Sequence, residues 1–330
     1  MDATEHDDPV EVTPEPEEDA APQEAPPVDA RDACEHARTL LRRIDESLAA
    51  GGSLEASGIP TAVGDLVDAA LSDRTALLEC ASGTGDSGDG AYLVAHSVNV
   101  AIYSLALASL VDTERDFLEQ VTCGALLHDV GLMSLGRGIV DKPGPLTREE
   151  WRYVREHPAL GARMLAGAFG VDPAATVVAL EHHIGVDGSG YPDRTPHRTP
   201  HLASRIVAIA DAYDAMTSPR SYAPARPGDE AMAVLARNAE ASYDPVLTGL
   251  FIGMLGIHPP GSVVGLEDGR TAVVVRPGSA DPLKPVVEVT PDGAGAEEER
   301  VLLDLAEPGA PAIEYALEPS APGTDADDRL

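Results

Sequence analysis

The sequence predicts a mainly α-helical protein that is followed by a small antiparallel β domain. Apolar residues recur at helical spacing over residues 31–49, and again from Ala91 to about Leu255. After His258 the pattern changes to short valine-rich runs that are separated by Asp-Gly and Pro-Gly pairs, and such pairs mark turns between strands. Together these observations predict a helical region first and an antiparallel sheet or barrel after it, over residues 256–310.

Acidic side chains gather at both ends of the sequence. Residues 1–30 contain eleven Asp and Glu but no Lys or Arg, and residues 281–330 contain thirteen acids against three bases. A highly charged segment with few apolar residues cannot bury enough surface to offset the entropy of ordering. We therefore expect a disordered acidic tail over residues 1–30 and a second acidic tail over residues 311–330.

Residues 31–90 are expected to form a helical N-terminal segment and a linker. Leucine and isoleucine recur at helical spacing over residues 31–49, and Gly51 and Gly52 end that helix. A second helix is expected within residues 60–79. The Ser/Gly-rich run at 82–90 predicts a flexible break.

Residues 91–255 are expected to form the main helical domain. Its first helix is apolar nearly all round, which predicts that it is buried. Thr147 and Glu150 match a capping box for a later helix. That helix should end near His157, because Pro158 disfavours helical geometry in the residue before it.

A loop over residues 184–201 interrupts the helical pattern with repeated Gly and Pro. A connector of that length without secondary structure is usually functional. We therefore expect it to contribute to a site.

The formal net charge of −33, from 56 acids and 23 bases, limits the partners of this chain. A protein that binds a nucleic acid polymer needs a basic face, and so does one that docks on an anionic membrane. The sequence argues against both partners. About two-thirds of the excess acid lies in the two terminal segments, so a small phosphodiester held by cations is not excluded.

Several features predict a cytoplasmic location. The three cysteines lie far apart without a C-x-x-C pair, as in proteins of a reducing compartment without disulfides. The first residues lack the basic and apolar segments of a signal peptide. The longest nearly apolar run, Val98–Val111, is too short to span a bilayer.

Histidines and aspartates concentrate on, or at the ends of, the predicted helices of the main domain. Several buried imidazoles and carboxylates are costly unless they share a cation, and this mixture of ligands suits Fe, Mn, Zn or Ni. Neighbouring His182 and His183 would point about 100° apart on a helix, so both reach one site only if the helix ends there. The candidate metal ligands are His96, His128, Asp129, His157, His182, His183 and Asp211.

Five motifs in order then resemble one family. The strings GALLHDVGLMSL, IVDKPGPLTREEW, REHPALGARML, EHHIGVDGSGYP and SRIVAIADAYDAMTSPRSY are similar to those of the HD-GYP family of metal-dependent phosphohydrolases. The resemblance covers roughly residues 91–255. It implies an HD-type helical bundle with a dinuclear metal site, two divalent ions that are usually Fe or Mn, and hydrolysis of cyclic di-GMP to pGpG or GMP.

The resemblance also assigns roles by position. It implies that the seven candidate ligands hold the metal ions, with Asp129 bridging and with His128 and Asp129 at the catalytic step. Tyr92 stands where three-metal members have Glu, which favours two ions. Arg220 matches an arginine that could hold a phosphate, and it would belong to both the catalytic and the substrate-binding residues. The substrate loop would be shaped by Gly188, Gly190, Tyr191 and Pro192.

Two positions depart from the family pattern. Leu132 replaces a lysine expected near the scissile phosphate, and Ile184 replaces a glutamate beside the metals. Activity could therefore be retained, slowed or redirected. The alternatives are a degenerate domain that binds a nucleotide or a partner, and a phosphohydrolase for another cyclic dinucleotide or phosphoester.

Two further points stay open in the sequence. Asp214 lies one turn after Asp211 and could support the metal site or act as a helix cap partner. A homodimer or a signalling protein could be the macromolecular partner.

Overall fold

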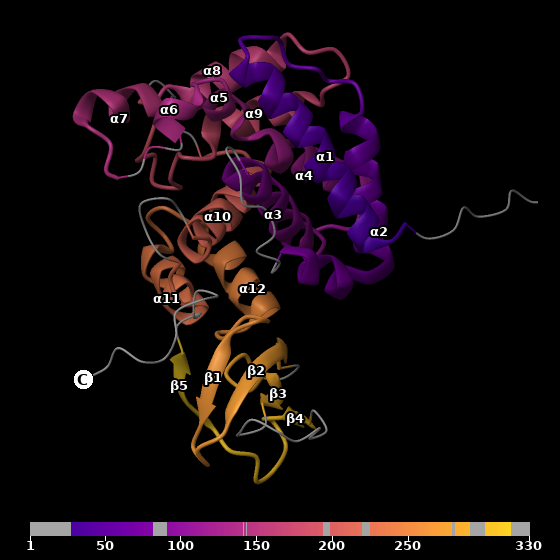
Figure 1. Cartoon of the computed structure of the whole chain (residues 1–330), viewed down its shortest axis with the longest axis vertical. Coiled ribbons are helices and arrows are strands. Elements are labelled where there is room, and N and C mark those ends of the chain that lie inside the picture. The colour runs from indigo at the N-terminus through magenta and orange to yellow at the C-terminus, as the bar shows by residue number, and fades with distance from the viewer. Residues whose placement is uncertain are drawn as a thin grey trace, which may run out of the picture.

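The computed structural model describes residues 28–81, 91–140, 142, 144–193, 199–219, 225–278, 281–290 and 301–317. A helical body lies at one end of the molecule and a small antiparallel sheet at the other (Figure 1). The predicted fold class is confirmed. Most of the two predicted acidic tails, the Ser/Gly-rich break at 82–90 and Arg220 lie outside the described residues. No described helix is both long enough and apolar enough to cross a membrane.

The first two helices, α1 (Ala30–Ala49) and α2 (Ile59–Ala81), pack along the helical body. The carboxylate of Asp29 caps α1 by accepting a hydrogen bond from the backbone N–H of Arg31 at 2.8 Å. The apolar stripe of α1 is buried. Buried residues of both helices belong to the same hydrophobic core as those of the following helices.

Helix α3 (Ala91–Ala108) runs through the centre of this core. It packs against α2, α4 (Arg115–Leu127) and α10 (Leu202–Thr217). Its apolar residues Val98, Ala101 and Leu105 are completely buried, as the sequence predicts for a helix that is apolar on all sides.

A series of short helices follows α4, so this part of the chain contains many helix ends. These are α5 (Val130–Met133), α6 (Arg137–Val140), α7 (Arg148–Val154), α8 (His157–Ala166) and α9 (Pro173–Glu181). The capping box of α7 is confirmed: Glu150 N–H donates to Thr147 Oγ1 at 3.2 Å, and Thr147 N–H donates to Glu150 Oε2 at 2.7 Å. The helix ends at Val154, earlier than predicted, and His157 begins α8.

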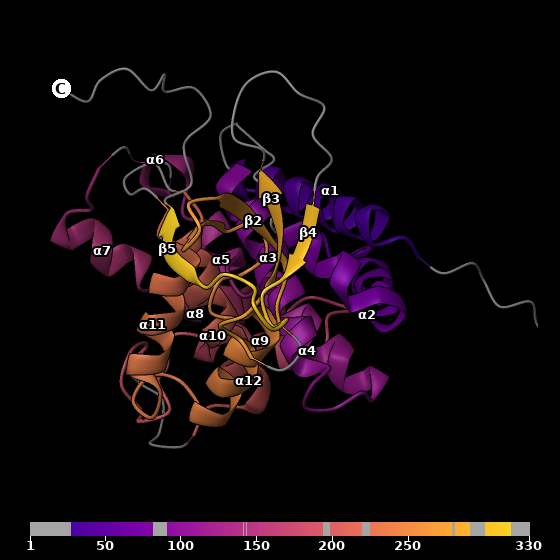
Figure 2. The same ribbon diagram turned by 90° about the horizontal axis from the view of Figure 1, so that it is seen from below.

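Helices α11 (Gly228–Asn238) and α12 (Pro245–Leu255) lead into a five-stranded sheet. Its strands are β1 (Val263–Leu266), β2 (Thr271–Arg276), β3 (Val286–Thr290), β4 (Val301–Asp304) and β5 (Ile313–Leu317). All neighbours are antiparallel, in the order β4-β3-β2-β1-β5, so β4 and β5 form opposite edges (Figure 2). The sheet has its own small core, which includes Val264, Val274 and Val287.

Strand β5 corrects one prediction. Residues 311–330 were expected to form an acidic tail, but 313–317 pair with β1, with Ala316 opposite Val264. The run Ile-Glu-Tyr-Ala-Leu is short and contains an acid, so its strand propensity is visible only beside a partner strand.

Candidate metal centre

Helix ends place the seven predicted ligands together. His128 follows the last residue of α4, Asp129 precedes α5, and His157 is the first residue of α8. His182 and His183 follow α9, which ends at Glu181. The helix therefore ends where the adjacent histidines require it to end. The remaining two, His96 and Asp211, project from the interiors of α3 and α10.

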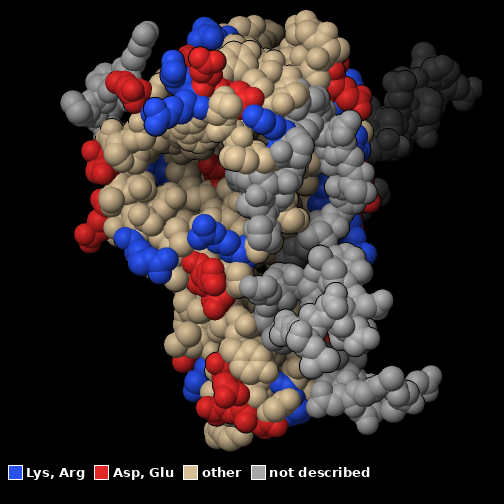
Figure 3. Space-filling model, turned by 60° about the vertical axis from the view of Figure 1, so that its left-hand side comes forward, with Lys and Arg blue, Asp and Glu red and all other residues tan. Residues whose placement is uncertain are grey.

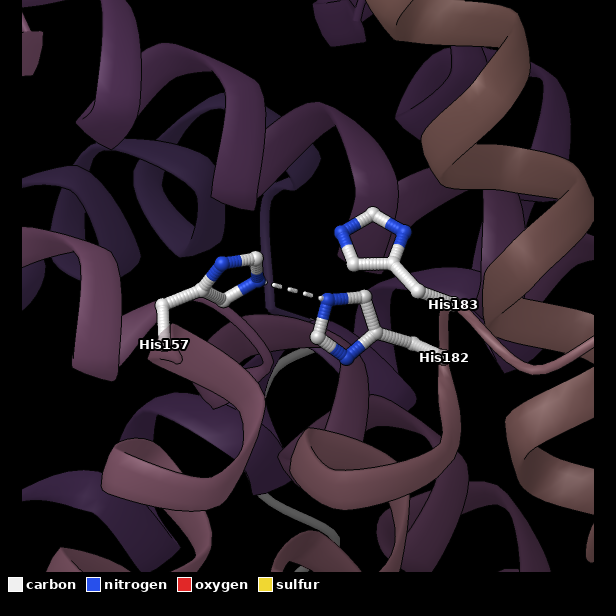
Figure 4. Close-up of side chains that lie close together, drawn as sticks. All are labelled: His157, His182 and His183. Carbon is white, nitrogen blue, oxygen red and sulfur yellow. Dashed lines mark hydrogen bonds between the residues drawn. The ribbon is translucent and has the colours of Figure 1, made fainter. Parts of the chain in front are cut away.

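Six of these side chains form two groups of potential metal ligands. One group is His157, His182 and His183, and the other is His96, His128 and Asp129. In each group the donor atoms lie within 4.8 Å of one another. Figure 4 shows the three rings of the first group, which come from two segments of the chain and point toward a common space. Of the six residues in the two groups, all but His183 are buried.

The carboxylate of Asp129 lies between the two groups. Its Oδ2 is 3.4 Å from His128 Nε2 and 3.8 Å from His96 Nε2. Its Oδ1 is 3.2 Å from His157 Nε2 and 3.7 Å from His182 Nε2. Each oxygen of one carboxylate thus faces a different group of imidazoles.

Asp211 spans the same two groups. Its Oδ1 lies 3.2 Å from His96 Nε2, and its Oδ2 lies 3.8 Å from His183 Nδ1. Two carboxylates therefore connect two sets of nitrogen donors, an arrangement suited to a pair of adjacent cations.

Backbone carbonyl groups orient three of the imidazoles. The Nδ1–H of His128 donates to Ala125 O at 2.7 Å, that of His157 to Val154 O at 2.8 Å, and that of His182 to Val178 O at 3.1 Å. A neutral imidazole has one N–H, so this tautomer leaves the Nε2 lone pair directed into the site. Such support is usual for metal-binding histidines.

The resulting contacts are unfavourable without a cation. His157 Nε2 and His182 Nε2 lie 3.2 Å apart (Figure 4), although both present lone pairs. Two further atoms of the site, His128 Nε2 and Asp129 Oδ1, are buried and make no hydrogen bond within the described part of the chain. Buried polar atoms without partners are costly. The donor set therefore fits metal ions.

The protonation states of His182, His183 and Asp129 suit metal binding. Burial lowers the pKa of His183 to about 4, and burial also holds the pKa of His182 well below its usual range. Burial opposes the charged form of Asp129, but His128 and His157 outweigh it and keep the pKa of this carboxyl low. Neutral imidazole and ionised carboxylate are the forms that bind metal.

His128 behaves differently because it faces a carboxylate. Burial disfavours its protonation, but Asp129 outweighs burial and raises the pKa of the His128 ring. A metal ion at this position would compete with that proton.

Asp214 both supports the centre and joins the end of its helix. Its Oδ2 lies 2.7 Å from His96 Nδ1. Its Oδ1 accepts hydrogen bonds from Asn99 Nδ2 at 2.9 Å and from Ser218 Oγ at 3.1 Å. Asp214 is buried, and it directs His96 Nε2 toward Asp129 and Asp211.

Two glycines allow the backbone to approach the ligands. A Cβ at Gly131 would lie 2.1 Å from His157 O, so only glycine lets α8 begin against α5. Gly190 has φ +95°, and a Cβ there would lie 2.0 Å from His183 O. The isolated bridge between Gly190 and Ile184 holds the loop over His183.

The site opens into a cavity of about 820 Å³. Tyr191 lies on one side, with its ring 4.5 Å from that of His183 and the Arg155 guanidinium 4.7 Å from its centre. The two departures from the family pattern, Leu132 and Ile184, also line the cavity. Figure 3 shows a hollow on one face of the molecule, with acidic atoms inside it and basic side chains nearby.

The predicted substrate-binding residues do not all line the cavity. Gly190 and Tyr191 line the cavity. Gly188 has φ +81° and belongs to the turn of the loop, but it is not among the described residues that line the cavity. Arg220 lies outside the described residues.

Comparison with known proteins identifies the family of this chain. The family model of the HD domain matches residues 76–247, more than half of the chain. The chain belongs to the HD domain family. The HD-GYP resemblance is confirmed, and an HDG"Y"P protein from Bdellovibrio bacteriovorus has a related fold, with a TM-score of 0.54 and 19% identity over 67% of this chain and 70% of that one.

Two relatives of this HD domain have named activities. It is 37% identical over 200 residues to a cyclic di-GMP phosphodiesterase of Pseudomonas aeruginosa, which covers 60% of this chain and 48% of the relative. It is 34% identical over 178 residues to 3'3'-cGAMP-specific phosphodiesterase 3 of Vibrio cholerae, covering 52% and 37%. The chain thus spans less than half of each relative.

Sequence reasoning missed several residues of this HD domain's site. Asn99 has no charge and no motif, and only its contact with Asp214 identifies it. Lys142 and Trp151 line the cavity. Both lie in the string IVDKPGPLTREEW, but the resemblance assigned them no role. One signal was available for Lys142, because the chain has only one other lysine. A signal was also available for Gly131: a glycine two residues after the His-Asp pair could have suggested that another part of the backbone packs closely there.

Proposed function

We propose that this chain is a metal-dependent phosphodiesterase that hydrolyses cyclic di-GMP to pGpG or GMP. The observation that carries the proposal is the position of Asp129, whose two oxygens face two separate sets of imidazoles. A site of this kind binds two cations close together, as enzymes of phosphoryl chemistry do. The names of the relatives support a cyclic dinucleotide as substrate.

The proposal assigns the seven side chains to two divalent ions, with Fe or Mn as the metals. The ligands would be His96, His128, Asp129, His157, His182, His183 and Asp211. Bound ions would polarise a phosphoryl oxygen and lower the pKa of a water molecule. Histidine and carboxylate donors favour transition metals over Mg²⁺ or Ca²⁺.

The protein's own residues prepare the site for this reaction. Carbonyl groups and Asp214 fix the imidazole rings before substrate arrives, so little reorganisation is needed during catalysis. The ring of Tyr191 packs against that of His183. The main helical region, residues 91–255, would thus form the catalytic unit.

The test combines metal analysis with a panel of cyclic dinucleotides on one preparation. The protein loaded with Mn or Fe should contain two ions per chain and hydrolyse cyclic di-GMP. His128→Ala and Asp129→Ala should each lower kcat at least ~100-fold, because even supporting residues of metal sites cost 10–100-fold. His36→Ala is the control, since His36 pairs with Asp65 outside the centre. A fully metallated protein without turnover would refute the proposal.

A second candidate is a degenerate domain that binds a cyclic dinucleotide without hydrolysing it. Leu132 and Ile184 favour it, because both place apolar side chains in the cavity. Loss of one phosphate-facing donor commonly slows an enzyme by ~10²–10³. Tight binding without turnover would support this candidate, and a gain of activity in the double variant Leu132→Lys, Ile184→Glu would identify a decayed enzyme. Turnover of a different member of the panel would assign another substrate.

A further inference from the structure

We propose that Lys142 binds a phosphate group of the substrate and that Glu150 positions it there. The inference rests on the proposed phosphodiesterase function, because a doubly charged cyclic dinucleotide is the assumed ligand. Lys142 lines the same cavity as Asp129, His183 and Tyr191. It is the only Lys or Arg among the described residues that line this cavity.

The charge of the site creates a need for such a cation. Within the described residues, the acidic side chains that line the cavity are Asp129 and Asp211, both of which face the metal ligands. Ions held there would neutralise the carboxylates and one phosphate of the substrate. The second phosphate of a cyclic dinucleotide would lie elsewhere in the cavity, where Leu132 and Ile184 contribute no charge.

Glu150 holds the ammonium group at the edge of the cavity. Lys142 Nζ donates to Glu150 Oε1 at 2.9 Å and to Oε2 at 2.6 Å. About 30% of the Lys142 side chain and 28% of the Glu150 side chain are exposed. Lys142 lines the cavity while Glu150 does not, so the pair lies at the cavity edge and is partly open to solvent.

The start of α7 in turn fixes Glu150. Its Oε2 accepts the backbone N–H of Thr147, and its own N–H donates to Thr147 Oγ1. The Lys142 ammonium and this capping interaction lower the pKa of Glu150 to about 2, so the carboxylate stays charged at neutral pH. A helix cap thus orients a lysine that lies five residues before it.

A purely structural role is the competing explanation. An ion pair that is partly open to solvent adds little to stability, so loss of Lys142 should barely change the melting temperature. A substrate contact predicts a different result: binding should weaken while folding and metal content stay constant.

The experiment compares two lysine variants in the full, Mn-loaded chain. Lys142→Met should raise both KM and Kd for cyclic di-GMP at least ~10-fold, the scale of one lost charged hydrogen bond, and should change kcat less. Lys284→Met is the matched control, because it removes the chain's other lysine, which is exposed before β3. Lys142→Arg retains the charge and should restore most of the affinity.

A second pair of variants tests the positioning role of Glu150. Glu150→Gln keeps the size but loses the charge that orients Lys142, so it should raise KM by a smaller factor than Lys142→Met and leave kcat nearly unchanged. Glu149→Gln, at the exposed neighbouring position, is its control. Adding Glu150→Gln to Lys142→Met should cause no further rise in KM.

The outcomes separate this inference from the proposed function. An unchanged KM and Kd in Lys142→Met would overturn the inference while leaving the phosphodiesterase intact. An equal loss of affinity in Lys284→Met, or a parallel loss of bound metal, would also overturn it. If the natural chain binds cyclic di-GMP without hydrolysis, the proposed function fails and the Kd values still decide the role of Lys142. If it binds no cyclic dinucleotide, both fail.

Discussion

Four of the five histidines of the centre present one defined ring nitrogen to it. Carbonyl groups of Ala125, Val154 and Val178 engage Nδ1 of three rings, and the carboxylate of Asp214 engages Nδ1 of His96. The rings could rotate or bind through the other nitrogen without these partners. The orientation of these rings is therefore fixed by groups that are not themselves predicted metal ligands.

Asp214→Asn tests this dependence. The amide cannot accept from His96, Asn99 and Ser218 at once, because one of its two positions is a donor. We expect metal affinity at the His96 group to fall about 10–100-fold, while the His157 group keeps its ion. Calorimetric titration with Mn²⁺ and the metal content per chain measure this change.

Asp65→Asn is the matched control for that variant. It removes a carboxylate that contacts His36 Nδ1 at 2.6 Å, in a pair that lies outside the centre. Two ions bound to Asp214→Asn with unchanged affinity would show that His96 needs no such support.

At the scale of elements, the site is built mainly from the ends of short helices. A residue just past a helix end is free of the regular 100° spacing, so His182 and His183 can face one space. Close contact between α5 and α8 then brings Asp129 beside His157. Gly131 makes that contact sterically accessible.

Gly131→Ala should therefore separate α5 from α8. The added Cβ would overlap His157 O and Gly161 N, and overpacking of a core usually costs about 1–3 kcal/mol of unfolding free energy. Urea denaturation measures this loss, and metal content should fall with it because His157 moves.

Gly253→Ala in α12 is the opposite case. A Cβ there meets nothing within 4 Å, and alanine in a helix interior is favoured over glycine by ~0.5–1 kcal/mol. Gly253→Ala should stabilise the chain slightly.

Equal stability of Gly131→Ala and the natural chain would contradict the close packing of α5 and α8.

At the scale of the whole molecule, the centre connects helices that are distant in sequence. Side chains from α3, α10 and the ends of α4, α8 and α9 meet there. A ligand that binds only the folded state stabilises it, by about 2.7 kcal/mol at a concentration 100 times its Kd. The sheet has a separate core and does not contribute to this set.

Chelation of the metal should lower the melting temperature of the helical body. Scanning calorimetry before and after treatment with a chelator measures the shift, and added Mn²⁺ should reverse it. His128→Ala should melt at a temperature that is nearly independent of the chelator. If the melting temperature of the natural chain is also unchanged by the chelator, no ion bridges these helices.

Local patterns were sufficient to predict much of the fold. The spacing of apolar residues located α1 and α3, and the Thr147 cap located the start of α7. Strand β5 was missed because its pairing with β1, rather than its composition, makes it a strand. The end of α7 was misplaced because the effect of Pro158 sets only a limit on where a helix can continue.

The sequence by itself determined which donors exist and that helix ends would present them, because residue type and helix boundaries are local properties. The tertiary structure decided which atoms meet: the two oxygens of Asp129 between two sets of imidazoles, the carboxylate behind His96, and Lys142 at the cavity edge. These contacts join segments far apart in the chain. They depend on how helices pack in three dimensions, which no local pattern specifies.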